Sequence, residues 1–204
     1  MLLCLATGVG YWAFKYYGTL LPMFPDNTDY ETMELRAEAA QRYAQRHRLD
    51  EDYCLFIDYG IPSGTPRLFV WSFREQKVVA RTYVMHGPGM GSTVEQPVFS
   101  NRPGSNCSSL GRFVVTKQHG HKLRRSYRIS GLDYSNKTAF DRGLMIHRST
   151  WVDRNCWRQY IPLHAPSCRG CVTVSSPGMT YLERLIEHQP KRLLLWSYCT
   201  KQNP

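Results

Sequence analysis

The stretch Tyr53-Cys54-Leu55-Phe56-Ile57-Asp58 is a short apolar run, and the segment that follows it at 61–66 is rich in Pro, Ser, Thr and Gly. Short apolar runs bounded by turn residues are typical of strands that are buried in a sheet. The segment 86–111 is the longest stretch between two such runs, and it is predicted to be a loop. Comparable apolar runs lie at 67–73, 77–84, 112–117, 126–132, 143–147, 171–174 and 193–198. The series predicts a mainly β domain, a sandwich or a barrel, with flanking helices.

Two helices are expected, one at each end of this series of strands. The first covers residues 26–50, where Thr28 and Glu31 have the spacing of a capping box. Its apolar stripe consists of Tyr30, Met33, Ala37, Ala40 and Ala44. The second helix begins near Ser176-Pro177, since Ser and Pro are typical of helix starts. Its apolar face consists of Met179, Leu182, Leu185 and Ile186.

The N-terminal residues 1–25 form an apolar segment with no charged side chain before Lys15. Its length is that of a signal-peptide core or a short membrane anchor. No basic residue precedes the apolar run, however, and no clear small-residue cleavage site follows it. A targeting or anchor segment and a buried N-terminal segment therefore both stay open. The predicted organisation is segment 1–25, helix 26–50 and one β-rich domain at 51–204.

The composition excludes several classes of protein. Of the 204 residues, 42% are hydrophobic and 21% are charged, which excludes a wholly disordered chain and a multi-span membrane protein. The chain carries 26 Lys and Arg against 16 Asp and Glu, a net charge of +10. Such a surface suits an anionic partner, namely nucleic acid, acidic lipid or an anionic cell-wall polymer. Because the chain has no dense block of Lys and Arg, we do not expect it to bind nucleic acid.

Cys171 is the candidate nucleophile, because it opens a β-type run immediately after a glycine. Gly170 allows the backbone to approach a ligand closely, and the amides beside Cys171 are suited to an oxyanion hole. His147 ends the apolar run at 143–147, so the sheet holds it next to a polar loop. A neighbouring imidazole is the usual means of making a thiolate. Cys171 and His147 therefore form a chemically complete pair for acyl transfer.

Three other interpretations use the same residues. A cysteine in a strand and a histidine at a strand end are often purely structural. Cys168-x-x-Cys171 has redox spacing, although no βαβ pattern surrounds it. The same pair is half of a zinc site, which Cys156, His147 or His164 would complete, although a second properly spaced ligand pair is missing. Spacing alone leaves these alternatives open.

Several stretches of the chain form a combined signature. They are two apolar runs at 54–58 and 67–70, a His-Gly loop at 85–89, a central motif at 99–105 and 108–111, and the segments 145–147 and 169–171 that hold His147 and Cys171. Together they resemble the murein L,D-transpeptidase catalytic domains of the YkuD-like superfamily, in particular the branch with a Ser-x-Gly-Cys motif. The resemblance covers residues 53–175. Any one of these stretches would be weak alone, but their combination is specific.

The resemblance implies a fold, an activity and a role for each site residue. The implied fold is a YkuD-like β-sandwich or barrel with an N-terminal and a C-terminal helix. The family's cysteine attacks the L-to-D peptide bond of a peptidoglycan tetrapeptide stem, releases the terminal D-alanine and passes the acyl group to an amine or to water. By position, Cys171 forms the thioester and His147 is the base. The backbone carbonyl near Arg148 would orient the ring, and the Gly170 and Cys171 amides would hold the oxyanion.

Four further residues are expected to bind substrate: His86, Arg169, Cys168 and Ser149. His86 belongs to the His-Gly loop of the resemblance, so it either binds substrate or supports His147. A hydrogen-bonded structural histidine on a Gly-rich turn is an equally valid interpretation.

Positions near the nucleophile depart from the family pattern. Cys168 stands where the family prefers Ser or Thr, Arg169 where it often has His or a bulky residue, and Thr173 close to where the better-known branch has Asn or Arg. These departures concern the substrate and the acceptor more than the nucleophile. We expect Cys168 to be a small, partly buried substitute for Ser, with a disulfide to Cys156 as one option. The aromatic-rich stretch 148–167 is expected to be a satellite core or else a lid.

The resemblance also implies partners and a cellular location. No metal and no organic cofactor is implied, and the expected partner is a peptidoglycan stem peptide rather than nucleic acid. The expected location is the bacterial cell envelope, in the periplasm, with the N-terminus either anchoring the protein in the membrane or directing its secretion. The runner-up function is a non-catalytic wall-binding module on the same fold. Retention of both Cys171 and His147 favours the enzyme, as an L,D-transpeptidase or, with water as acceptor, an L,D-carboxypeptidase.

Overall fold

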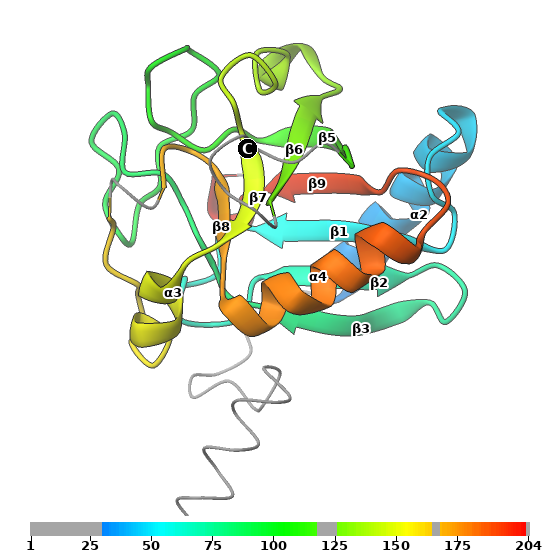
Figure 1. Ribbon diagram of the computed structural model, residues 1–204, viewed down its shortest axis with the longest axis horizontal. Coiled ribbons are helices and arrows are strands. Elements are labelled where there is room, and N and C mark those ends of the chain that lie inside the picture. Colours follow the sequence, from blue (N-terminus) through cyan, green and yellow to red (C-terminus); the bar gives the residue numbers. More distant parts are fainter. Residues whose placement is uncertain (1–29, 118–125, 165–167, 203–204) are drawn as a thin grey trace, which may run out of the picture.

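The computed structural model describes residues 30–117, 126–164 and 168–202 (Figure 1). The expected targeting segment 1–25 and Thr28 of the expected capping box lie outside these ranges. In the described ranges, no helix is both long enough and apolar enough to cross a membrane.

In the described part of the chain, nine strands form one mixed sheet in the order β3-β2-β1-β9-β5-β6-β7-β8-β4. The strands are β1 (Tyr53–Asp58), β2 (Leu68–Ser72), β3 (Lys77–Thr82), β4 (Val84–Met85), β5 (Gly111–Val115), β6 (Ser126–Gly131), β7 (Met145–Arg148), β8 (Val172–Val174) and β9 (Leu194–Tyr198). The β1–β9 and β7–β8 pairs are parallel, and the other neighbours in this order are antiparallel. The two outermost strands, β3 and β4, are separated in the chain by Tyr83 alone, so the sheet forms a nearly closed barrel. The predicted mainly β fold is confirmed.

The strand β1 is buried on both faces, which explains why its sequence shows no alternation of apolar and polar residues. Leu55 and Ile57 belong to the main core cluster, whereas Cys54 and Phe56 belong to a second cluster on the opposite face. Each face is covered by one helix. The two flanking helices that the sequence predicts therefore close two separate apolar layers.

The helix α2 (Tyr30–Arg46) covers the second cluster. Its buried residues are Met33, Ala37, Ala40, Tyr43 and Ala44. The predicted stripe is confirmed except at Tyr30, the first residue of the helix, which is 43% exposed. Tyr43 was not predicted to be buried, but it follows Ala40 by three positions and so lies on the same helix face.

The helix α4 (Ser176–His188) covers the main cluster with Met179, Leu182 and Ile186. Its N-cap is Ser175, one residue before the predicted start, and the Ser175 side chain accepts a hydrogen bond from the Gly178 amide at 3.2 Å. Figure 1 shows α4 in front of the strands and α2 behind them.

A short helix, α3 (Thr150–Asn155), lies in the aromatic-rich stretch, where the sequence had not predicted one. It belongs to a small third cluster of Tyr83, Met85, Val152, Cys156, Ile161 and Cys168. This arrangement favours the satellite core over the lid. Cys156 and Cys168 are both free thiols, so the suggested disulfide between them is not formed.

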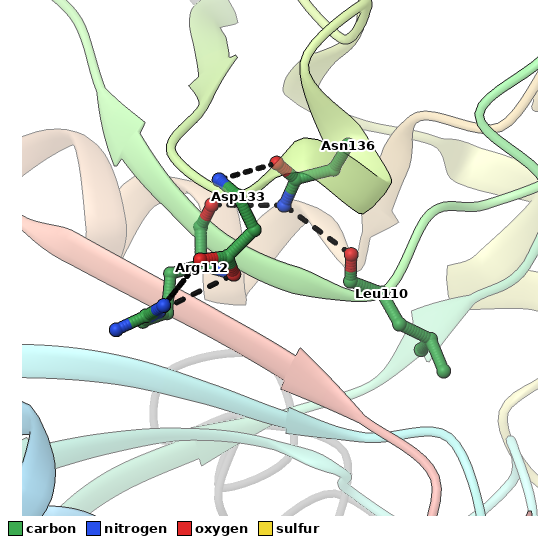
Figure 2. A network of polar contacts seen from close by, with 4 residues as sticks. All are labelled: Leu110, Arg112, Asp133 and Asn136. Carbon is green, nitrogen blue, oxygen red and sulfur yellow. Dashed lines mark hydrogen bonds and ion pairs between the residues drawn. The ribbon is translucent and has the colours of Figure 1, made fainter.

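A polar network fastens the start of β5 to the 3-10 turn η1 (Tyr134–Asn136) (Figure 2). The buried Asn136 donates from Nδ2 to the carbonyl oxygens of Leu110 at 3.2 Å and Arg112 at 2.8 Å. Its Oδ1 accepts from the Asp133 amide at 3.0 Å, and the Asp133 carboxylate pairs with the Arg112 guanidinium. The network fixes the point at which the long loop after β4 enters the sheet.

We expect Asn136→Ala to lower the free energy of unfolding by about 2–3 kcal/mol, because the change leaves buried carbonyl and amide groups without partners. Urea unfolding followed by circular dichroism measures this loss. Asn155→Ala is the matched control, since Asn155 is only partly buried and donates one hydrogen bond, to Trp151 O at 2.8 Å. Equal losses in the two variants would contradict the importance of the network.

Candidate active site

Parallel pairing of β7 with β8 brings the two predicted catalytic segments side by side. His147 pairs with Thr173, and Ile146 pairs with Val172. Cys171 immediately precedes β8 and stands two residues before Thr173, which corresponds to about 7 Å of extended chain. The strand pairing thus holds His147 next to β8, the strand that begins immediately after Cys171.

The His147 ring is fixed at both nitrogens. Its Nδ1–H donates to the carbonyl oxygen of Arg148 at 3.0 Å, because a carbonyl can only accept. Nε2 therefore carries the lone pair, and the Thr173 hydroxyl lies 3.2 Å from it. Burial lowers the pKa of His147, and the hydrogen bond to Arg148 partly opposes this shift. The imidazole is accordingly neutral at neutral pH, with its basic nitrogen on the side of β8.

The Cys171 thiol is the partly exposed one among the described cysteines, since Cys54, Cys107, Cys156, Cys168 and Cys199 are all buried. Burial raises the pKa of the Cys171 thiol above its usual value. Three groups lower this pKa: the backbone amide of Met145, the Arg142 guanidinium and the backbone amide of Arg169. The thiol is therefore protonated at neutral pH and needs a base to become a nucleophile.

Gly170 meets the two requirements that favour glycine, a left-handed backbone and a close approach. Its φ is +93°, and a Cβ placed on it would lie 2.2 Å from the carbonyl oxygen of Cys107. The loop that carries Cys107 thus packs directly on the backbone before the nucleophile. The Gly170 backbone acts to lower the pKa of the Cys168 thiol, and the oxyanion role of the Gly170 amide stays a prediction.

We expect Gly170→Ala to reduce turnover by about a hundredfold, because a shift of about 1 Å at a reacting group has that order of effect. Gly91→Ala is the matched control: φ at Gly91 is +77°, but a Cβ placed there would meet no atom within 4 Å beyond its chain neighbours, so only the backbone cost of about 1–2 kcal/mol applies. Initial rates and melting temperatures of both variants check this expectation. Similar rates for the two would show that the contact with Cys107 is unimportant.

Cys168, three residues before the candidate nucleophile, is buried. Its thiol donates to the carbonyl oxygen of Cys171 at 3.4 Å, and burial raises its pKa to about 12. A redox-active Cys-x-x-Cys pair needs a low thiol pKa, which a helix N-terminus usually supplies. Here a strand follows Cys171 instead, so the geometry favours the expected role of Cys168 as a small substitute for Ser over the redox alternative.

The zinc alternative requires a third ligand beside Cys168 and Cys171. Among the residues that the structure describes, no group of three or more His, Cys, Asp or Glu side chains is arranged to hold a metal ion. His164, one of the suggested third ligands, stacks on the Trp151 ring with the ring centroids 4.5 Å apart.

His86 is engaged inside the protein. It is 1% exposed, Arg67 donates from Nη2 to its Nδ1 at 3.0 Å, and its Nε2 donates to the carbonyl oxygen of Thr93 at 2.8 Å. Burial and the Arg67 charge lower the pKa of His86 to about 3, so the ring stays neutral. Since both nitrogens are occupied, the geometry supports the structural interpretation of His86 rather than contact with substrate.

The other predicted residues lie at the surface of this region. Arg169 and Arg148 are exposed, and the part of Arg148 that the site uses is its carbonyl group. Ser149 is the N-cap of α3, and its hydroxyl accepts from the Trp151 amide at 3.2 Å. Of the four predicted substrate-binding residues, Arg169 is thus the one whose side chain is free to meet a ligand from solvent.

Sequence reasoning missed Arg142, which lies in the connection between η1 and β7. The Arg142 charge lowers the pKa of the Cys171 thiol. Its guanidinium also donates a hydrogen bond to the carbonyl oxygen of Cys107, in the loop that contacts Gly170. Its hydrogen-bond partners are 33 to 42 residues away in the chain, so no local motif reveals it.

A family model described as the L,D-transpeptidase catalytic domain matches residues 25–197, which include α2, α4 and every site residue named above. A search of curated proteins found no match. The family that the sequence motifs resemble is thereby confirmed.

Proposed function

The chain belongs to the L,D-transpeptidase catalytic domain family, and from this premise we propose that it is a cysteine acyltransferase that acts on peptidoglycan tetrapeptide stems. The observation that carries the proposal is the pairing of β7 with β8. It holds a neutral His147, with Nε2 free of hydrogen, beside the strand that follows Cys171. A neutral base next to a protonated thiol is the arrangement that nucleophilic catalysis requires.

In the first half of the proposed reaction, His147 Nε2 accepts the proton of the Cys171 thiol as the sulfur attacks the carbonyl carbon of the L-to-D peptide bond. The carbon–sulfur bond forms, and the carbonyl electron pair moves to the oxygen, which the Cys171 amide stabilises. The imidazolium then gives its proton to the nitrogen of D-alanine as the carbon–nitrogen bond breaks. A thioester on Cys171 and free D-alanine result.

In the second half, His147 removes a proton from the acceptor as the acceptor attacks the thioester, and the Cys171 sulfur leaves and is reprotonated. An amine acceptor gives a cross-linked peptide, and water gives the tripeptide. The Thr173 hydroxyl lies 3.2 Å from Nε2, and it can donate to the neutral ring or accept from the imidazolium. Thr173 therefore keeps the ring in place in both of its protonation states.

The wider organisation follows from the same proposal. A peptidoglycan substrate lies in the cell envelope, where residues 1–25 would serve as the targeting or anchor segment that precedes the helix and the catalytic domain. The net charge of +10 suits an anionic envelope polymer.

The decisive experiment incubates the full chain with disaccharide-tetrapeptide muropeptides and resolves the products by mass spectrometry. Dimers would identify a transpeptidase, and tripeptides with free D-alanine would identify a carboxypeptidase. Unchanged muropeptides in the presence of folded protein would overturn the proposal and favour the wall-binding module.

A further inference from the structure

The guanidinium of Arg142 gathers one loop around itself. Nη1 donates to Ser100 O at 2.8 Å and to Ser109 Oγ at 2.7 Å, and Nη2 donates to Cys107 O at 2.6 Å and to Ser105 Oγ at 3.4 Å. All four acceptors lie between residues 100 and 109. A single side chain therefore ties both ends of this segment, which we call the clamp loop (residues 100–109), to the start of β7.

The clamp loop meets the nucleophile at Gly170. A Cβ at Gly170 would lie 2.2 Å from Cys107 O and 3.0 Å from Arg142 Nη2, so the backbone before Cys171 touches both the loop and the cation that holds it. Any displacement of the Arg142 guanidinium would thus shift the backbone of Gly170, the residue before Cys171.

The Arg142 charge is not neutralised by its hydrogen-bond partners. They are two carbonyl oxygens and two hydroxyls, and within the described residues no ion pair joins Arg142 to a carboxylate. Burial lowers the pKa of Arg142, and the charges of Cys107 and Cys171 in their thiolate forms oppose this shift. Because the ordinary pKa of a guanidinium lies far above neutral, the cation stays charged at neutral pH, and its charge lowers the pKa of the Cys171 thiol.

The thiols, the phenol and the imidazole around Cys171 are neutral at neutral pH, and the charged Arg169 acts on Cys171 through its backbone amide. Burial raises the pKa of Cys168 and of Tyr59 to about 12 and raises that of Cys107, while burial lowers that of His147. A neutral imidazole supplies no standing positive charge for a thiolate. Among the described side chains, Arg142 is the one whose positive charge lowers the pKa of the Cys171 thiol.

We propose that Arg142 is a positioning residue, whose guanidinium holds the clamp loop against Gly170 and stabilises the Cys171 thiolate as it forms. A catalytic role for Arg142 rests on the function proposed above, in which Cys171 is the nucleophile. The ionisation of Cys171 can nevertheless be measured without any peptidoglycan substrate.

The test is the pH dependence of iodoacetamide alkylation at Cys171 in the full chain, measured by peptide mapping from about pH 6 to about pH 11 so that the midpoint is reached. Removing a nearby opposite charge raises a thiol pKa by about one unit or more. Arg142→Gln should therefore slow alkylation about tenfold at each pH below the midpoint. Arg142→Lys keeps the charge and should stay near the wild type.

Arg128→Gln is the matched control. Arg128 is also partly buried and also donates to a backbone carbonyl, that of Phe140, but it does not act on the Cys171 thiol. Its alkylation profile should match the wild type.

A merely structural role would give a different result. A loosened loop would change the limiting rate at high pH in both Arg142 variants and leave the midpoint unmoved. An unshifted midpoint in folded Arg142→Gln, or an equal shift in Arg142→Lys, would overturn the proposal. Either result is distinguishable from failure of the proposed function, which would appear as unchanged muropeptides in the wild type.

Discussion

Cys171→Ala is expected to abolish the release of D-alanine from tetrapeptide muropeptides while the fold is retained. Removing the nucleophile of a catalytic pair costs a factor on the order of 10⁴ or more in turnover. Since Cys171 is partly exposed and precedes β8, its loss leaves no large cavity and no broken strand pairing. Mass spectrometry of the muropeptides measures the activity, and circular dichroism with a thermal melt checks the fold.

Two companion variants make this test specific. Cys171→Ser should be nearly inactive, because a hydroxyl is a far poorer nucleophile than a thiol without a base tuned to it. Cys54→Ala should keep turnover, since Cys54 lies in the second core cluster on the opposite face of the sheet. A folded Cys171→Ala protein with near-normal rates would end the assignment of the nucleophile.

The strands were predictable where burial alone decides the local structure. The run at Tyr53–Asp58 coincides with β1, because both of its faces are covered and every position is apolar or ends at a turn. The run at 77–84 was predicted as one strand, but Tyr83 divides it into β3 and β4. Closure of the barrel between these two strands is a tertiary effect, which no local pattern contains.

The helices show the same limit. The α4 start was predictable because Ser and Pro carry the capping signal locally, whereas α3 has six residues and too short a pattern for helical periodicity to appear. Tyr43 is buried because α2 packs on the second core cluster, which includes Leu194 and Tyr198 of β9. Contact between distant segments, rather than propensity, decides these cases.

The candidate site divides in a similar way. His147 ends an apolar run, and Cys171 opens a β-type run immediately after a glycine, so local features mark both residues in the sequence. The role of His86 could not be decided from its Gly-rich loop, because its partner Arg67 is 19 residues away. Arg142 was invisible for the same reason: all four of its acceptors belong to a distant loop, and only the fold brings them together.

His147→Ala is expected to lower kcat/KM by a factor of about 10²–10⁴, the usual contribution of a general base, and to change the pH profile. In the wild type the neutral imidazole is the active form, so activity should fall as pH drops through the pKa of His147. Burial lowers that pKa from the usual value of 6.5, so the midpoint of the acid limb should lie below it. In the variant this limb should disappear, and the residual rate should rise with pH as Cys171 itself ionises.

Initial rates on tetrapeptide muropeptides between about pH 4 and about pH 10 give both profiles. His188→Ala is the matched control, because His188 also bonds a backbone carbonyl through Nδ1, that of Arg184 at 2.7 Å, but it is exposed at the end of α4. The control should keep the wild-type acid limb. An acid limb that survives in His147→Ala would assign the titration to another group. A wild-type midpoint above 6.5 would instead mean that His147 is an imidazolium paired with a thiolate, contrary to the direction in which burial shifts its pKa.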